Sequence, residues 1–184
     1  MRKLILEEWI SLDGHTSDKN GSLDFFAHTI RDTYTNEQQF LNTIDTILLG
    51  RTTYEQFSKT WPQRPIENDP LAETINKGRK IVFSNTLQEA HWSPYPKAEM
   101  ANGNAIEYIR QLKATPGKNF ILWGSISLAQ TFMKENLIDE YRLHVCPVVT
   151  GGGGKLFKEA INLKLVETKQ YANGNTLLIY RPAV

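Results

Sequence analysis

The chain has 184 residues, of which 40% are hydrophobic and 10% aromatic, so it is long enough and apolar enough for a folded core. Its formal net charge of +1 lacks the basic excess of a general nucleic-acid-binding protein. A single cysteine, Cys146, excludes an internal disulfide and favours a reducing compartment. No apolar run approaches the roughly 20 residues that cross a bilayer. We therefore expect one cytoplasmic domain over residues 1–184, without membrane contact.

Apolar runs and helical patterns alternate along the chain. Strands are expected over 3–10, 46–49, 80–83, 120–123 and 141–149. Helices are expected over 33–44, 53–61, 103–112 and 125–134, and the polar segment 69–77 is typical of a surface helix. Strands at 163–168 and 177–181 flank Asn173-Gly174, which predicts a hairpin. The pattern predicts an α/β fold with a mostly parallel central sheet, flanking helices and an antiparallel C-terminal hairpin.

Several familiar site types do not fit the sequence. The glycine run 151–154 precedes Lys155, but Val149 and Leu156 occupy the glycine and hydroxyl positions that a phosphate P-loop requires. A flexible turn between a strand and a loop is the better interpretation of this run, and a backbone role near a ligand is the alternative. The four histidines and Cys146 show no metal-ligand spacing, so we expect no metal site. His144 and Cys146 share one face of a strand and are expected to be buried there.

Two strand-to-helix junctions combine a glycine with polar side chains, at Leu49-Gly50-Arg51-Thr52-Thr53 and Leu122-Trp123-Gly124-Ser125-Ile126. A helix N-terminus at the carboxyl end of a parallel strand presents free N–H groups, and glycine lets a ligand approach the backbone. A third strand, 80–83, ends in Ser84 and Asn85 at the same expected edge. Ordinary helix capping uses the same residue types. Together, however, the junctions indicate an anion site suited to a pyrophosphate.

The sequence resembles the dihydrofolate reductase superfamily, and most of all the reductase half of the bifunctional riboflavin-biosynthesis deaminase-reductase. The matching segments occur in the family's order across nearly the whole chain: Ser11-Leu12-Asp13-Gly14, Leu48-Leu49-Gly50-Arg51-Thr52-Thr53-Tyr54-Glu55, Val82-Phe83-Ser84-Asn85-Thr86-Leu87, Ile121-Leu122-Trp123-Gly124-Ser125, Leu137-Ile138-Asp139-Glu140 with Pro147-Val148-Val149, and 151–157. No segment is diagnostic alone, but the ordered set is fairly specific.

The resemblance implies NADPH as hydride donor. Phosphate and ribose groups would contact Gly50, Arg51, Thr52 and Thr53, the adenosine 2′-phosphate would lie near Ser84 and Asn85, and the pyrophosphate would be bound by Gly124, Ser125, Ile126 and Ser127. Ser11 and Asp13 would lie near the nicotinamide and the substrate. The residues alone indicate an anion site at the two junctions, and the resemblance implies that this anion is the phosphate groups of NADPH.

Two departures from the family leave the substrate open. Dihydrofolate reductases carry Gly-Gly at Gly124-Ser125, and the riboflavin-pathway reductases carry a substrate-contacting glutamate at Trp123. Dihydrofolate reductases also use an acid on their first helix. That position falls near Tyr34, and Asp32 is the candidate catalytic acid, with Glu37 close by. Both acids also suit a solvated helix face.

The sequence therefore predicts an NADPH-dependent oxidoreductase that acts on a small heterocycle. The leading activity is reduction of 5-amino-6-(5-phosphoribosylamino)uracil, with dihydrofolate reduction second and another small heterocycle third. Two rival hypotheses remain, namely a nucleotide-binding protein of this fold that lacks catalysis and a structural α/β domain without a ligand. The resemblance also suggests a homodimer, to which the strand 141–149 would contribute.

Overall fold

Eight strands form one continuous sheet in the order β4-β3-β2-β5-β1-β6-β8-β7. In this computed structural model, residues 1–27, 30–34 and 37–183 are described, and the side chains of residues 31 and 32 lie outside the description. The strands are β1 (Leu4–Ser11), β2 (Ile44–Gly50), β3 (Arg79–Phe83), β4 (Glu99–Ala101), β5 (Asn119–Trp123), β6 (Glu140–Cys146), β7 (Leu163–Gln170) and β8 (Thr176–Pro182).

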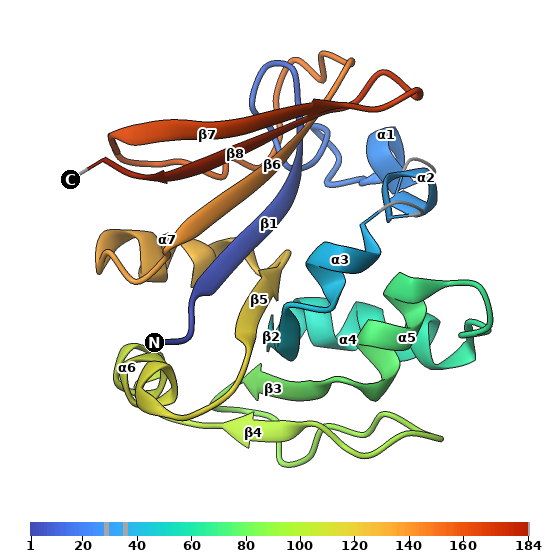
Figure 1. The fold of residues 1–184 in the computed structure, drawn as a ribbon, viewed down its shortest axis with the longest axis vertical. Coiled ribbons are helices and arrows are strands. Elements are labelled where there is room, and N and C mark those ends of the chain that lie inside the picture. Colours follow the sequence, from blue (N-terminus) through green and yellow to red (C-terminus); the bar gives the residue numbers. More distant parts are fainter. Residues whose placement is uncertain (28–29, 35–36, 184) are drawn as a thin grey trace.

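Helices cover both faces of this sheet (Figure 1). One side carries α1 (Asp24–Ala27), α2 (Ile30–Tyr34), α3 (Gln38–Leu41), α4 (Arg51–Thr60), the 3₁₀ turn η1 (Trp61–Gln63) and α5 (Pro70–Lys77). The other side carries α6 (Ala105–Ala114) and α7 (Ile126–Lys134). The α-helix α4 ends before Pro62, because proline lacks the backbone N–H that a further α-helical turn would need.

Strand direction confirms the expected fold class. β1 pairs in parallel with β5 and β6, and β2 pairs in parallel with β3 and β5. β8 runs antiparallel to both β6 and β7. β4 pairs in parallel with β3, so the carboxyl ends of the six parallel strands β1 to β6 lie at one edge of the sheet, where α4 and α7 begin.

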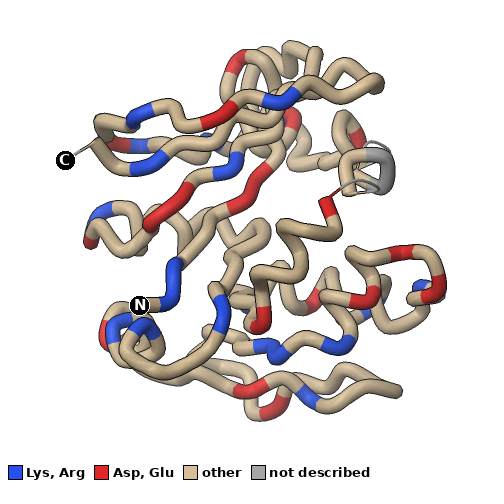
Figure 2. The backbone as a smooth tube through the Cα atoms, viewed as in Figure 1, with Lys and Arg blue, Asp and Glu red and all other residues tan. Residues whose placement is uncertain are grey.

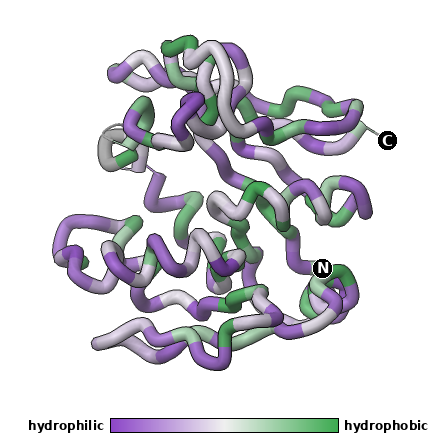
Figure 3. The backbone as a smooth tube through the Cα atoms, turned by 180° about the vertical axis from the view of Figure 1, so that it is seen from behind, coloured by the Kyte–Doolittle hydropathy of each residue, from purple (hydrophilic) through white to green (hydrophobic). Residues whose placement is uncertain are grey.

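The central strands are buried on both faces, as expected when helices cover a parallel sheet. All eight residues of β1 are buried, and so are most of β2 and β5. Seen from behind, hydrophilic stretches follow the outer helices and loops (Figure 3). One apolar cluster lies under α1–α5 and a second lies under α6 and α7. Polar side chains on β1 are therefore in the interior rather than in water.

The structure differs from the expectations in two places and adds one strand that was not predicted. The single helix over 33–44 is replaced by the end of α2, by α3 and by the start of β2 at Ile44. The segment 69–77 forms α5, but half of this helix is buried, namely Leu71, Ala72, Ile75 and Asn76. The short edge strand β4 had no sequence signal strong enough to predict it. In addition, β6 is paired on both sides, so its backbone edge is not free for a dimer contact.

Candidate functional site

The two glycine junctions lie against each other at the carboxyl edge of the sheet. The Gly50 N–H donates a 2.7 Å hydrogen bond to Ser125 Oγ. The Ser125 N–H donates a 2.9 Å bond to Thr53 Oγ1, and the two hydroxyl oxygens of Ser125 and Thr53 are 3.0 Å apart. The N-termini of α4 and α7 are thereby fixed side by side, as the sequence pattern required for one shared ligand.

Neither of these two helices is capped by a side chain. The N-cap residues are Gly50 for α4 and Ser125 for α7, and neither makes a side-chain capping bond. By contrast, α5 and α6 are capped by Asp69 and Asn104, which accept bonds from first-turn N–H groups. Ordinary capping therefore does not explain the junctions. Their first-turn N–H groups remain available to an anion at the positive ends of two helix dipoles.

The glycines are required by the contact between the junctions. A Cβ at Gly50 would lie 3.2 Å from Ser125 Oγ, and one at Gly124 would lie 3.1 Å from Thr53 Oγ1. Gly124 also has φ of +58°, a conformation that side chains other than glycine's adopt at a cost. Sequence reasoning had attributed both glycines to ligand approach, and the structure adds this packing role.

A second polar group lies beside the first turn of α4. The Arg51 guanidinium donates to Glu55 Oε1 at 2.7 Å and to Thr86 Oγ1 at 2.9 Å, while about half of its side chain remains exposed. Ser84 Oγ accepts the N–H groups of Thr86 and Leu87. Arg51 and the loop after β3 are thus held together, next to the joined junctions.

The other residues proposed for a cofactor lie around these groups. Asn85 Oδ1 accepts the Gly103 N–H at 2.7 Å, which fixes the loop after β3 to the loop before α6. Thr52 and Ser127 are exposed on the first turns of α4 and α7, and Ile126 is half-buried. The residues that the sequence predicts to contact a cofactor therefore share one edge of the sheet.

Ser11 and Asp13 hold a loop rather than presenting free groups. Asp13 accepts the Ser11 hydroxyl at 2.6 Å and the N–H groups of Thr150 and Gly151 at 3.1 and 2.9 Å. The Ser11 bond and these backbone donors hold the pKa of Asp13 well below its usual range, against a smaller opposing effect of desolvation. Asp13 thus fixes the glycine run beside the end of β1.

The glycine run packs closely against the loop after β1. A Cβ at Gly153 would lie 1.9 Å from the carbonyl oxygen of Ser17, which no side chain could accommodate. The Thr16 N–H donates to the Gly154 carbonyl at 2.7 Å, and the Gly154 N–H donates to Ser17 Oγ at 2.9 Å. The run therefore serves the packing of two loops at the edge of the site.

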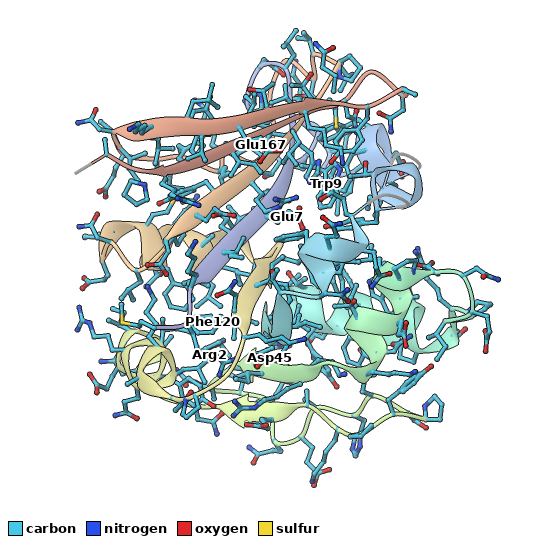
Figure 4. The ribbon with its side chains drawn as sticks, viewed as in Figure 1. Arg2, Glu7, Trp9, Asp45, Phe120 and Glu167 are labelled. Atoms are coloured by element: carbon cyan, nitrogen blue, oxygen red, sulfur yellow. The ribbon has the colours of Figure 1, made fainter. Side chains whose placement is uncertain are left out.

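A buried polar cluster lies next to the junctions, on the side of the sheet covered by α1–α3. Figure 4 shows Glu7 of β1 in its interior, with Trp9 further along the strand. Glu7 Oε2 accepts the indole N–H of Trp123 at 2.8 Å and the Tyr34 hydroxyl. Glu7 Oε1 accepts Arg142 Nε at 3.0 Å and lies 2.9 Å from His144 Nε2.

The donors around Glu7 keep its carboxyl ionised. Burial alone raises its pKa, but the charge of Arg142, the contacts with His144 and the Tyr34 hydrogen bond together lower it to about 2. Burial and the Glu7 charge raise the pKa of the Tyr34 hydroxyl well above its usual value. The cluster is therefore built around one fixed negative charge in a nearly water-free interior.

A second carboxylate extends the cluster towards solvent. Glu37 Oε2 accepts Arg142 Nη2 at 3.0 Å, and Glu37 Oε1 contacts Lys169 Nζ and, at 3.2 Å, the Tyr171 hydroxyl. The Arg142 guanidinium lies over the Phe40 ring, 3.6 Å from its centroid. Arg142 thus connects both carboxylates, and the half-exposed Lys169 marks the outer limit of the cluster.

Trp9 and His144 leave two polar atoms without a partner. Their rings stack with centroids 4.4 Å apart, and Phe26 stacks on the other side of Trp9 at 5.9 Å. Both Trp9 Nε1 and His144 Nδ1 are buried and lack a hydrogen-bond partner in the described part of the chain. A buried polar atom without a hydrogen-bond partner destabilises the folded state, so these two atoms are candidates to bind a polar group of a ligand.

Sequence reasoning found part of this cluster and missed its centre. Trp123, proposed for the substrate pocket, is buried at 3% exposure and belongs to the cluster. Glu7, Arg142 and His144 were not proposed as site residues, and a charged residue inside an apolar strand was the signal available for them. The Asp32 side chain, proposed as the catalytic acid, lies outside the described residues.

Charges of both signs are spread over the molecule (Figure 2), without a one-sided basic surface. In the described ranges, no group of three or more acidic, histidine or cysteine side chains is arranged to hold a metal ion. Among the same residues, no helix is long and apolar enough to span a membrane. Burial raises the pKa of the Cys146 thiol to about 11, so this side chain is a packing element rather than a nucleophile.

The fold and the joined helix N-termini define a dihydrofolate reductase-like α/β protein. It is similar to the dihydrofolate reductase from Enterococcus faecalis complexed with NADP(H), with a TM-score of 0.61 and 14% identity over 99% of this chain and 97% of that one. Residues 2–177 match the family model of the RibD C-terminal domain. The chain therefore belongs to the RibD C-terminal domain family.

Relatives of known sequence and structure agree with this assignment. YyaP of Bacillus subtilis (strain 168), an uncharacterized protein, is 36% identical over 97% of this chain and 94% of its own length. The deaminase and 5-amino-6-(5-phosphoribosylamino)uracil reductase from Thermotoga maritima has a TM-score of 0.68 and 17% identity, over 99% of this chain but 57% of that one. A candidate riboflavin biosynthesis protein from Shewanella gives a TM-score of 0.78 and 24% identity, with 99% of both chains covered.

Proposed function

We propose that this protein is an NADPH-dependent reductase of a small heterocyclic substrate. The observation that carries the proposal is the pair of uncapped helix N-termini, joined through Ser125 and flanked by the half-exposed Arg51. Two adjacent positive helix ends with free N–H groups fit a pyrophosphate, and a neighbouring guanidinium fits a further phosphate. Membership in a family with reductase neighbours supports the same activity.

The bound cofactor would supply a hydride, and the chain would bind and orient both reactants. Gly50, Arg51, Thr52, Thr53, Ser84, Asn85, Gly124, Ser125, Ile126 and Ser127 would contact NADPH. The polar cluster under α1–α3 would face the substrate, because Trp9 and Trp123 stand at the ends of β1 and β5 beside the junctions. Fixed charges in that interior would orient a polar ring, since little water is present to screen them.

The substrate to test first is 5-amino-6-(5-phosphoribosylamino)uracil, followed by dihydrofolate. The test measures NADPH oxidation with each compound in steady-state assays, together with NADPH affinity by fluorescence titration. Turnover of any heterocycle above the rate without substrate supports the proposal. If the protein binds no NADPH at millimolar concentration, and NADPH leaves its melting temperature unchanged, the proposal is wrong.

One observation favours a second function, a nucleotide-binding protein without catalysis. Both carboxylates of the described cluster are fully engaged, Glu7 with four donors and Glu37 with three. A committed carboxylate is a poor proton donor, and the structure does not describe the Asp32 side chain. Tight NADPH binding without turnover of any pterin or pyrimidine would establish this second function instead.

A further inference from the structure

Two consecutive glutamates of β1 lie on opposite faces of the sheet. Glu7 is paired in register with Trp123 and faces the polar cluster under α1–α3. Glu8 points to the other face, which Leu6 and Ile10 share and which α6 and α7 cover. It is 5% exposed, among apolar side chains. The Glu8 carboxyl is not part of the hydrogen-bond network around Glu7, and the proposed function assigns no role to it.

Glu8 lies directly beneath the turn that begins α7. Its Oε1 accepts the Trp9 N–H at 3.2 Å, and the backbone N–H of Gly124 lies near enough to its carboxyl to lower its pKa. Its Oε2 is buried and has no partner among the residues that the structure describes. The buried carboxyl of Glu8 therefore lies beside the peptide of the candidate phosphate site, and its Oε2 is available to carry a proton.

Among the described residues, the charge that acts on Glu8 is that of Glu7 rather than that of a cation. Burial, followed by the charge of Glu7, raises the pKa of Glu8 to about 8, although its two backbone hydrogen bonds oppose this. On β6, Arg142 and His144 face Glu7 on the opposite side. On α7, Lys134 lies in the last turn, at the far end of the helix. Glu8 is thus expected to be protonated at neutral pH.

We propose that Glu8 is a positioning residue that couples anion binding at the Gly124–Ser125 turn to its own protonation. As a neutral acid it lies beside the Gly124 N–H and leaves the positive end of α7 to the ligand's phosphate. As a carboxylate it occupies that positive end itself and repels the phosphate. This inference rests on the proposed function, because it takes the bound anion to be the pyrophosphate of NADPH.

Linkage makes the coupling measurable in two directions. NADPH affinity falls as pH rises through the range in which Glu8 ionises, and bound NADPH raises the pKa of Glu8 by an equivalent amount. For a buried charge that lies beneath the candidate phosphate site, we expect an effect of roughly tenfold in affinity, which equals about one pKa unit.

The test compares the dissociation constant of NADPH at pH 7 and pH 9.5 for the wild type and for Glu8→Gln. The wild type should bind roughly tenfold more weakly at the higher pH. Glu8→Gln cannot ionise and should bind equally at both pH values, near the wild-type value at pH 7. Glu135→Gln removes an acid at the opposite end of α7 and should keep the wild-type dependence.

Each result separates this inference from the proposed function. Equal pH dependence in the wild type and Glu8→Gln overturns the role of Glu8 while leaving NADPH binding intact. Absence of NADPH binding to the wild type at either pH overturns the proposed function and this inference with it. If Glu8→Gln does not fold, the carboxyl carbon resonance of Glu8 in the wild type is titrated with and without NADPH. An unchanged midpoint then refutes the coupling.

Discussion

The indole N–H of Trp123 donates a 2.8 Å hydrogen bond to the carboxylate of Glu7, which is its register neighbour on β1. The riboflavin-pathway reductases that the sequence resembles carry a glutamate at the position of Trp123. In this chain the carboxylate stands on the adjacent strand instead, and the tryptophan is one of its donors. This edge of the sheet therefore carries a buried negative charge on β1, beside Trp123.

This relationship predicts that Glu7→Gln destabilises the protein. The substitution keeps the volume but removes the charge that compensates Arg142 in the interior, and breaking a buried pair from one side costs about 3–5 kcal/mol. Urea denaturation at pH 7 measures the change in the free energy of unfolding. The double variant Glu7→Gln with Arg142→Met should recover part of the loss. A change below about 1 kcal/mol would show that the pair is not coupled.

The same carboxylate predicts an acid-sensitive component of stability. Because Glu7 has a folded-state pKa of about 2 and the ordinary value for a glutamate is 4.5, its contribution to stability is complete above pH 4.5 and is lost as the pH falls towards 2. Denaturation curves between pH 7 and pH 2 should therefore show a smaller pH-dependent loss in Glu7→Gln than in the wild type. Parallel profiles would contradict the lowered pKa.

How much of this site follows from the sequence depends on how local its signals are. The junctions at Gly50 and Gly124 were predictable because each lies within a few residues of a strand end and a helix start. Glu7 and Arg142 are 135 positions apart, and their pairing depends on the neighbouring positions of β1 and β6 in the sheet. The prediction of one helix over 33–44 was wrong for a related reason, because tertiary contacts of Tyr34 and Glu37 divide that segment.

Ser125→Ala is expected to weaken NADPH binding more than it weakens folding. It removes the acceptor of the Gly50 N–H and a contact with Thr53, which together fix the two helix ends. Loss of one such hydrogen bond costs about 1 kcal/mol of stability, while the disturbed junction should lose several-fold in affinity. Fluorescence titration with NADPH measures the second effect, and Thr131→Ala in the middle of α7 is the control. Unchanged affinity would remove Ser125 from the proposed site.

Arg51→Ala is expected to weaken NADPH binding more than NADH binding. The half-exposed guanidinium is directed by Glu55 and Thr86, so it is positioned to add a fork of donors for the extra phosphate of NADPH. We expect about a tenfold or greater loss for NADPH and a smaller loss for NADH. Parallel titrations with both cofactors decide the matter, with Arg51→Lys as the variant that keeps the charge. Equal losses would show that Arg51 does not distinguish them.

Gly124→Ala tests the packing role of the α7 junction. The new methyl group would meet Thr53 Oγ1 at 3.1 Å on a backbone with positive φ, so we expect a loss of about 1–3 kcal/mol in stability. Thermal denaturation measures it, and Gly14→Ala is a matched control. Gly14 has φ of +81° but open space around its Cβ position, and should therefore show only the cost of the backbone conformation. A larger loss at Gly14 would contradict the packing role.

Glu8 predicts a pH dependence of stability in the ligand-free protein. Its folded-state pKa of about 8 lies above the ordinary value of 4.5, so its contribution to stability is complete below pH 4.5 and is lost as the pH rises from 4.5 to about 8. Glu8→Gln removes this ionisation. The melting temperature of the variant should therefore rise relative to that of the wild type between about pH 5 and pH 8, because the unfolded wild type ionises in this range while the folded wild type keeps its proton. A constant difference between the two proteins across this range would show that Glu8 does not titrate there, and that the turn before α7 tolerates its charge.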